Sequence, residues 1–266
     1  MKLLKEFGLT EQQLRRILVG RNGKPKIIKE QITNKEFEFA VISDTHLCSR
    51  YEAIDELLTF YHICKKMGIK HIVHAGDLID GGMTHAGWEN EIHTFGADRQ
   101  VAYVVKNYPK LDGIQTYFIS GSHDYSFWKR AGVEVGRLIE SQRPDLHYLG
   151  MVKGDVEIGG VKIMLIHPSG GAPYSKSYRA QKIAEQIPSG EKPHILVVGH
   201  LHYAIYMFYR NMHILHAGAF QWQTPYLKEK SLNPDVGGWT IRVRIADDKK
   251  KSIVSITPSF IPFFGR

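Results

Sequence analysis

The stretch FEFAVISDTH, residues 37–46, places an apolar, β-branched run directly before Asp44 and His46. Such a run is typical of a buried strand with the polar pair at its carboxyl end. Similar short apolar runs precede four further groups along the chain: Asp77, His123 with Asp124, His167, and His200 with His202. Because parallel strands end at one edge of a sheet, we expect these side chains to converge on one crevice.

Carboxylates and imidazoles gathered in this way form a nitrogen and oxygen ligand set that suits Mn, Fe, Zn or Ni. Asp44 and His46, like His200 and His202, are two positions apart, so in an extended backbone both side chains point the same way. A glycine precedes both Asp77 and His200, and glycine allows a close backbone approach at a turn. Each pair alone is a weak signal, but five such pieces in this order strongly indicate a metal site.

Length and composition are those of an ordinary folded domain. The 266 residues suffice for one large core, with 43% hydrophobic and 23% charged residues, as in a soluble globule. No apolar run approaches membrane-spanning length, and the N-terminus meets charge too early for a secretory signal. Two cysteines do not make a disulfide framework. We therefore expect a reduced, cytoplasmic protein with no membrane association.

Positive charge is concentrated at the N-terminus. Residues 1–35 hold nine Lys and Arg against three Glu, so they carry +6 of the net charge of +8. A basic arm beside a phosphate-handling site would attract a polyanion, but a solvated terminal segment explains the same charge. A capping box at Thr10 and Gln13 and a stop at Gly20 predict a helix here. We expect residues 1–35 to form a basic helix and linker, and residues 36–266 to form the main domain.

The main domain is predicted to alternate strands and helices and then to become rich in strands. The first half predicts strands at 37–43, 70–75 and 114–120 and helices at 52–67, 89–107 and 132–142. The second half predicts a hairpin of 152–158 and 161–167, a helix at 177–187, and strands at 195–198, 204–209, 213–216, 239–245 and 252–257. Two sheets packed face to face, with helices outside, accommodate both halves.

The ordered set Asp44-x-His46, Gly76-Asp77-x-x-Asp80, Gly121-Ser122-His123-Asp124, His167 and Gly199-His200-x-His202 resembles the motifs of the calcineurin-like metallophosphoesterase superfamily. The resemblance covers about residues 37–225, and it is specific for the superfamily but not for a substrate. It implies an α/β fold, a four-layer αββα sandwich of two mixed β-sheets flanked by helices. It also implies two divalent metal ions, with Mn²⁺ expected first and Fe, Zn or Ni as alternatives.

By position, the resemblance implies a role for each motif residue. The first ion would take Asp44, His46 and His202, the second would take His167 and His200, and Asp77 would bridge both. His123 would be the catalytic histidine and Asp80 the acid that orients it. A hydroxide bridging the metals would attack the phosphoester, while His123 stabilises charge or protonates the leaving oxygen.

One position departs from the family's pattern. Ser122 stands where the family has an asparagine whose carbonyl binds the second metal. A serine hydroxyl is shorter and usually a poorer ligand, so it would bind through a water or leave the second site weak. We therefore expect a weaker second metal.

Several side chains near the motifs are candidates for substrate binding. Trp128, Lys129 and Arg130 follow the third motif, and an aromatic beside cations can stack a base and hold a phosphate. Such aromatics more often wall a site or belong to the core. Asp124 is a further candidate. His85 is interpreted as a structural imidazole, with the alternative that it lines the cleft, because it lies just after the second motif.

The leading functional hypothesis is a phosphodiesterase or nuclease acting on nucleic acid. The basic arm and the aromatic and cationic residues after His123 support it, with an analogy to archaeal repair nucleases and polymerase-associated exonuclease subunits. The alternative, a small-molecule phosphomonoesterase or cyclic-nucleotide phosphodiesterase, predicts little dependence on salt or on residues 1–35. A third hypothesis is a phosphate-binding scaffold without chemistry, for which Ser122 would be the first sign.

Overall fold

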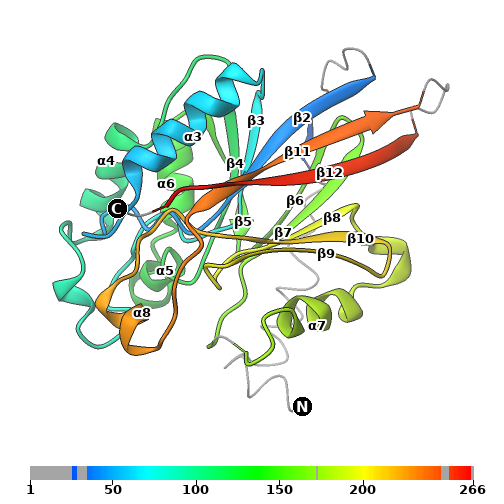
Figure 1. Cartoon of the computed structure of the whole chain (residues 1–266). Helices are drawn as coiled ribbons and strands as arrows, with labels where there is room; N and C mark the ends of the chain where they lie inside the picture. The colour runs from blue at the N-terminus through cyan, green and yellow to red at the C-terminus, as the bar shows by residue number, and fades with distance from the viewer. Residues whose placement is uncertain (1–25, 29–34, 172, 247–251, 265–266) are drawn as a thin grey trace.

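Two six-stranded sheets form the centre of the molecule in the computed structural model, which describes residues 26–28, 35–171, 173–246 and 252–264 (Figure 1). The first sheet has the strand order β12-β11-β2-β3-β4-β5. Strands β2 to β5 are parallel, whereas β11 is antiparallel to both β2 and β12. These strands are β2 (Glu36–Ile42), β3 (His71–His74), β4 (Gln115–Ser120), β5 (Leu146–Met151), β11 (Gly237–Ile245) and β12 (Ile253–Pro262).

The second sheet is also mixed, with the order β1-β6-β7-β8-β10-β9. Its β7, β8 and β10 are parallel, and β6 and β9 pair antiparallel with β7 and β10. Its strands are β1 (Lys26–Ile28), β6 (Lys153–Ile158), β7 (Val161–Ile166), β8 (Ile195–Val198), β9 (Ala204–Tyr209) and β10 (Met212–Ala217).

Helices cover the outer faces of the two sheets. In Figure 1, α3, α4 and α6 lie over the first sheet and α7 lies over the second. The described helices are α3 (Ile54–Lys66), α4 (Ala97–Asn107), α5 (Tyr125–Ala131), α6 (Val135–Gln142), α7 (Tyr178–Gln186) and α8 (Pro225–Glu229), with 3₁₀ turns η1 (Trp88–Asn90) and η2 (Ser189–Glu191). Among the described residues, each helix is too short or too polar to span a bilayer.

Three apolar clusters show that the elements form four layers. In β2, alternate side chains point to opposite faces: Ala40 and Ile42 pack toward α3, while Phe39 and Val41 pack into the space between the sheets. The third cluster joins the outer face of the second sheet to Ala180 and Ala184 of α7. Helix, sheet, sheet and helix thus each bury their apolar surface against the next layer. The predicted four-layer αββα sandwich of two mixed sheets is confirmed.

Some predicted boundaries are wrong, and glycine explains two of them. The helix expected at 89–107 begins only at residue 97, because Gly96 adopts φ 91° and residues 88–90 form a 3₁₀ turn. The helix expected at 132–142 is preceded by the unpredicted α5, which ends at Gly132 with φ 68°, and α6 begins at residue 135. Strand β5 was also missed, because its sequence LHYLGM contains neither a continuous apolar run nor strict alternation.

Part of the N-terminal prediction lies outside the described residues. The helix expected from Thr10 to Gly20 and most of the basic arm belong to this part of the chain. Residues 26–28, expected within the linker, form β1 and pair parallel with β6 in the register Lys26 to Val156. This short piece of the basic segment therefore extends the second sheet at one edge.

Candidate metal centre

Loops that follow β2, β3, β4, β7 and β8 bring the motif residues together. Asp44 N–H donates to the carbonyl of Gly76 at 2.9 Å, and His46 N–H donates to the carbonyl of Asp77 at 3.0 Å, so the first two loops run side by side. His200 N–H donates to both oxygens of the Asp44 carboxylate, at 3.1 and 2.9 Å, which ties the two sheets together at this point. The predicted convergence of strand ends is thus observed.

The backbone of these loops is strained where the polar side chains project. Positive φ is uncommon outside glycine and tends to cluster at functional sites. Five motif residues adopt it: Asp44 (52°), His46 (42°), Asp77 (54°), His200 (79°) and His202 (55°). The glycine before Asp77 allows the close approach that the sequence predicted, because a Cβ at Gly76 would lie 2.5 Å from Nδ1 of His167.

Asp44, His46 and His202 form the first group of possible metal ligands. Nε2 of His46 lies 3.2 Å from Nε2 of His202, and Oδ1 of Asp44 lies 3.3 Å from Nε2 of His202. Metal bonds of about 2.0–2.2 Å to nitrogen and oxygen separate neighbouring ligand atoms by about 3.0–3.5 Å. The spacing of this group therefore fits ligands around a single ion.

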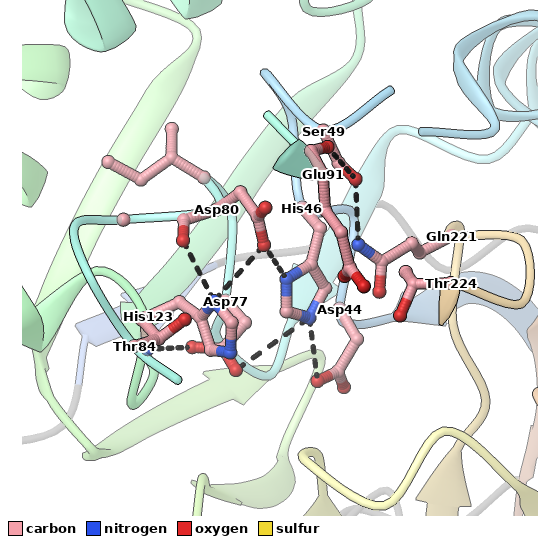
Figure 2. A network of polar contacts seen from close by, with 12 residues as sticks. Asp44, His46, Ser49, Asp77, Asp80, Thr84, Glu91, His123, Gln221 and Thr224 are labelled. Atoms are coloured by element: carbon pink, nitrogen blue, oxygen red, sulfur yellow. Dashed lines mark hydrogen bonds and ion pairs between the residues drawn. The ribbon is translucent and has the colours of Figure 1, made fainter. Parts of the chain in front are cut away.

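Asp77, His167 and His200 form the second group, with ligand atoms within 4.8 Å of one another. Oδ2 of Asp77 lies 2.9 Å from Nε2 of His167 and 3.8 Å from Nε2 of His46 in the first group. The Asp77 carboxylate therefore lies between the two groups, in the position that a bridging ligand needs. Figure 2 shows the same carboxylate between His46 and His123.

Hydrogen bonds determine which ring nitrogen of each histidine faces the groups. Carbonyl and carboxylate oxygens only accept, so Nδ1 of His167 donates to the carbonyl of Ala75 at 2.7 Å, and Nδ1 of His46 donates to Oδ1 of Asp80 at 2.9 Å. Each Nε2 is then left facing the carboxylates. Nε2 of His167 is buried and lies 2.9 Å from Oδ2 of Asp77. Because its lone pair and the nearby Asp77 oxygen repel unless a cation or proton intervenes, these residues fit a divalent metal.

Burial and charge shape the pKa values of the two groups. Burial alone would lower the pKa of His167, but the carboxylates of Asp77 and Asp44 raise it to about 9. Burial likewise opposes ionisation of Asp44 and Asp77, yet the surrounding histidines hold the pKa of both carboxyls below its usual value. Burial, followed by the charge of His167, lowers the pKa of His200 to about 4. The metal-free cluster therefore holds anionic carboxylates that protons on neighbouring imidazoles balance.

Ser122 lies at the edge of the second group. Its Oγ donates to Oδ2 of Asp77 at 3.2 Å and lies 3.5 Å from Nδ1 of His200. The hydroxyl thus touches two members of the second group, from the position where the family's pattern has an asparagine.

His123 lies beside the two groups and is oriented by Asp80. Nδ1 of His123 is 2.8 Å from the Asp80 carbonyl and 3.1 Å from its Oδ1, so its proton points at Asp80. The backbone N–H of His123 also donates to Oδ1 of Asp77 at 2.7 Å. Its ring packs edge-on against His46, with centroids 4.5 Å apart. The Nε2 atom is therefore the nitrogen left to face a substrate.

Asp124, a candidate for substrate binding, lies behind the motif loops. Its carboxylate is buried and accepts from the backbone N–H groups of Leu78, Ile79 and Gly121, at 3.1, 2.9 and 2.8 Å. A carboxylate held in this way braces the loop that carries Asp77.

The other substrate-binding candidates lie on α5 and on the loop after β3. Trp128 is 39% exposed, and Lys129 lies over the ring of Tyr125 at 5.2 Å. Arg130 donates to the carbonyl of Met83 at 2.9 Å, so it fastens α5 to the loop. His85 is half-buried; its ring stacks on Tyr226 at 4.2 Å, and its Nε2 lies 3.5 Å from Glu91 Oε2. Trp128, Lys129 and Arg130 are thus all exposed, whereas His85 is partly buried.

Several supporting residues lie behind the motif loops. The Thr45 hydroxyl contacts Nε2 of His74 at 3.1 Å, and the N–H of Gly76 donates to Nδ1 of His74 at 3.2 Å, so this buried histidine braces the first two loops. The Gln100 side chain accepts from the N–H of Gly81 and donates to its carbonyl, at 3.1 and 2.7 Å. A Gln on an amphipathic helix gives no sequence signal for such a role.

A family model described as the calcineurin-like phosphoesterase superfamily domain matches residues 37–232 of this chain. A curated relative, the DNA polymerase II small subunit of Methanothermobacter thermautotrophicus, is 24% identical to this chain in an alignment that covers 81% of this chain. The chain spans about half the length of that relative, with 53% of it covered.

Solved structures with a similar fold include an archaeal phosphodiesterase, at 12% identity and a TM-score of 0.45, covering 85% of this chain and 100% of that one. They also include Vps29 from Entamoeba histolytica in complex with zinc, at 14% identity and a TM-score of 0.42, covering 85% and 99%.

Proposed function

This chain belongs to the calcineurin-like phosphoesterase superfamily of metal-dependent phosphoesterases, and we propose that it hydrolyses phosphodiester bonds in nucleic acid. The observation that carries the proposal is the pair of ligand groups with the Asp77 carboxylate between them and His123 directly beside them. Two metal sites that share a carboxylate, next to an oriented imidazole, provide what phosphoester hydrolysis requires.

The proposed ligands are those that the sequence indicated. Asp44, His46 and His202 would hold one ion, His167 and His200 the other, and Asp77 both. A pair of divalent cations in this position supplies Lewis acidity and lowers the pKa of water toward neutrality. We propose Mn²⁺ as the ion, since a mixed set of carboxylates and imidazoles suits it.

His123 and Asp80 would act on the leaving group. Burial would lower the pKa of His123, but the carboxylates of Asp77 and Asp80 raise it, which favours the protonated imidazole. Because Nδ1 is bound to Asp80, the proton to be donated is the one on Nε2. Asp80 fixes the ring and its tautomer, as carboxylates that orient a catalytic imidazole do.

Nucleic acid is the proposed substrate class for three reasons. Residues 1–35 are strongly basic, and a polyanion is the partner that such charge attracts. Trp128 and Lys129 place an exposed aromatic and a cation on the helix that follows His123. The curated relative is the small subunit of a DNA polymerase.

We also propose a cytoplasmic location. The two cysteines are buried and unpaired, which supports it.

A substrate panel on metal-stripped protein reloaded with Mn²⁺ tests the proposal. It compares a bis-aryl phosphodiester, an aryl monoester, single-stranded DNA and duplex DNA, with His123→Asn as the inactive control. We expect cleavage of the diester and of DNA. Preference for the monoester would favour a small-molecule phosphatase, and binding without turnover of any ester would favour a scaffold.

Salt dependence distinguishes the substrate classes further. Binding of a polyanion weakens steeply when salt rises from about 50 to about 200 mM, whereas binding of a small diester does not. We expect KM for DNA to rise over this range while KM for the bis-aryl diester stays constant. Equal salt responses would contradict the proposed substrate class and leave the phosphoesterase assignment intact.

A further inference from the structure

A guanidinium outside the predicted motifs holds the loop that follows β7. Nη1 of Arg179, in the first turn of α7, donates to the carbonyls of Ser169 and Gly170 at 2.9 and 3.0 Å. Its Nη2 donates to the carbonyl of Gly171 at 2.6 Å. Three successive carbonyls are thus turned toward one planar, rigid donor fork.

The middle carbonyl of the three binds a proposed metal ligand. Nε2 of His200 lies 2.7 Å from the oxygen of Gly170. Since a carbonyl can only accept, Nε2 carries the proton, and Nδ1 presents its lone pair to the second group. That Nδ1 lies 3.5 Å from Oγ of Ser122.

The two histidines of the second group are held by very different acceptors. Nδ1 of His167 donates to Ala75, the residue directly after β3 and therefore part of the sheet framework. The acceptor of His200 is an exposed glycine of a loop, with φ 95°. A loop carbonyl needs an external anchor to keep its direction. Arg179 provides one, and its own helix is anchored by the buried Ala180 and Ala184.

We propose that Arg179 is a positioning residue for the second metal: by fixing the Gly170 carbonyl, it holds His200 with Nδ1 toward Asp77 and His167. The inference rests on the metal centre of the proposed function. We call Arg179 and the three carbonyls that it binds the clamp. The second site depends on the clamp because Ser122 replaces the family's asparagine ligand, which leaves the two histidines and the shared carboxylate to define the site.

The clamp predicts a specific metal-binding defect. Residues that orient a metal ligand typically contribute 10–100-fold to affinity. In a calorimetric Mn²⁺ titration of the metal-stripped full chain, without substrate, Arg179→Met should weaken the lower-affinity step by about 10–100-fold and leave the higher-affinity step unchanged. In Arg179→Lys, the affinity of this step should lie between those of the wild type and Arg179→Met, because an ammonium cannot span three carbonyls.

Lys182→Ala on the same helix is the matched control, since it removes a surface ion pair with Glu185 and a contact with the Tyr178 ring but no contact to the Gly170 loop that the structure records. A folded Arg179→Met variant with an unchanged second step would overturn the proposal. Equal weakening of both steps, together with a lower Tm, would show a general structural role and overturn it as well.

The tautomer of His200 gives a second readout that does not depend on metal. In nitrogen-15 spectra of the metal-free wild type, we expect the Nε2–H form of His200, and in Arg179→Met a mixture of both tautomers. An unaltered tautomer in the variant would contradict the clamp. The metal and tautomer results stand even if no nucleic acid is cleaved, so failure of the clamp and failure of the proposed function are distinguishable.

Discussion

Oδ1 of Asp80 accepts a hydrogen bond of 2.9 Å from Nδ1 of His46. The same oxygen lies 3.1 Å from Nδ1 of the proposed catalytic histidine, His123. One carboxylate oxygen therefore orients both a proposed metal ligand and the proposed acid, as Figure 2 shows. Removing its charge should disturb metal binding and turnover together.

Asp80→Asn tests this shared role. The amide keeps the shape of the side chain but is a weaker acceptor, so both imidazoles lose orientation. We expect Mn²⁺ affinity and kcat on the bis-aryl diester each to fall about 10–100-fold. Titration of the metal-stripped variant and steady-state kinetics measure the two effects. A variant that loses activity but binds metal normally would show that Asp80 acts on His123 alone.

His123→Asn should separate chemistry from metal binding. His123 is a proton donor in this account and not a ligand, so kcat should fall by about 10²–10⁴-fold while elemental analysis finds unchanged metal content. His62→Asn, on the exposed side of α3, is the matched control and should retain full activity. Turnover by His123→Asn at the wild-type rate would remove this residue from the mechanism.

Ser122→Asn should strengthen the second metal site. The hydroxyl of Ser122 reaches Asp77 and approaches His200, and an asparagine there would present a carbonyl oxygen to the second group. We expect tighter binding of the second Mn²⁺ in a competitive titration. Ser141→Asn on the surface of α6 controls for the substitution itself. Identical isotherms for wild type and Ser122→Asn would refute the explanation given for the serine.

Metal binding should release protons. Burial tends to lower the pKa of His167, but Asp77 and Asp44 raise it to about 9 in the metal-free protein, so near neutral pH this imidazole is protonated. A metal ligand must be deprotonated, and affinity should therefore rise with pH up to about pH 9. Calorimetry in buffers of different ionisation enthalpy counts the protons released. Uptake of protons, or none exchanged near pH 7, would contradict the proposed role of His167.

His216 should limit stability in acid. This buried histidine of β10 lies 4.7 Å from the ring of Tyr203, and neither of its ring nitrogens has a hydrogen-bond partner among the described residues. Burial, and then the charge of Arg179, lowers its pKa to about 4. Because the folded-state pKa is depressed, its neutral form stabilises the fold above pH 6.5, and that contribution is lost as pH falls toward 4.

His216→Phe removes this titration. When pH is lowered from about 7.5 to about 4, the free energy of unfolding of the variant should fall by about 2–3 kcal/mol less than that of the wild type. Urea unfolding at both pH values measures the difference, and His62→Phe at an exposed site is the control. A difference between variant and wild type that does not change with pH would contradict a neutral, buried His216.

The sequence predicted the layered fold because its strands carry their own signal. In β2, Phe39 to Ile42 are buried on both faces, so the segment is continuously apolar. The helix predicted at 89–107 is shorter in the structure. Glu91 accepts a hydrogen bond from the backbone N–H of Tyr226, far along the chain, and Gly96, with φ 91°, interrupts the helical backbone just before α4. The bond to Tyr226 depends on tertiary structure and leaves no periodicity in the sequence, whereas the break at Gly96 is local.

The site was predictable to the extent that its residues follow strands. Asp44 and His200 were placed in one crevice from their positions alone, and the structure joins them by hydrogen bonds. Gln100 and Arg179 were not predictable, because each binds backbone carbonyls of a loop that precedes it in the sequence. The placement of Asp124 was not predictable either, because adjacency to His123 says nothing about which way a side chain points.

Anomalous scattering from crystals of the full chain grown in excess Mn²⁺ tests the central claim most directly. The account predicts two peaks on either side of the Asp77 carboxylate, one contacting Asp44, His46 and His202 and the other contacting His167 and His200. An anomalous map without a peak at these side chains would contradict it.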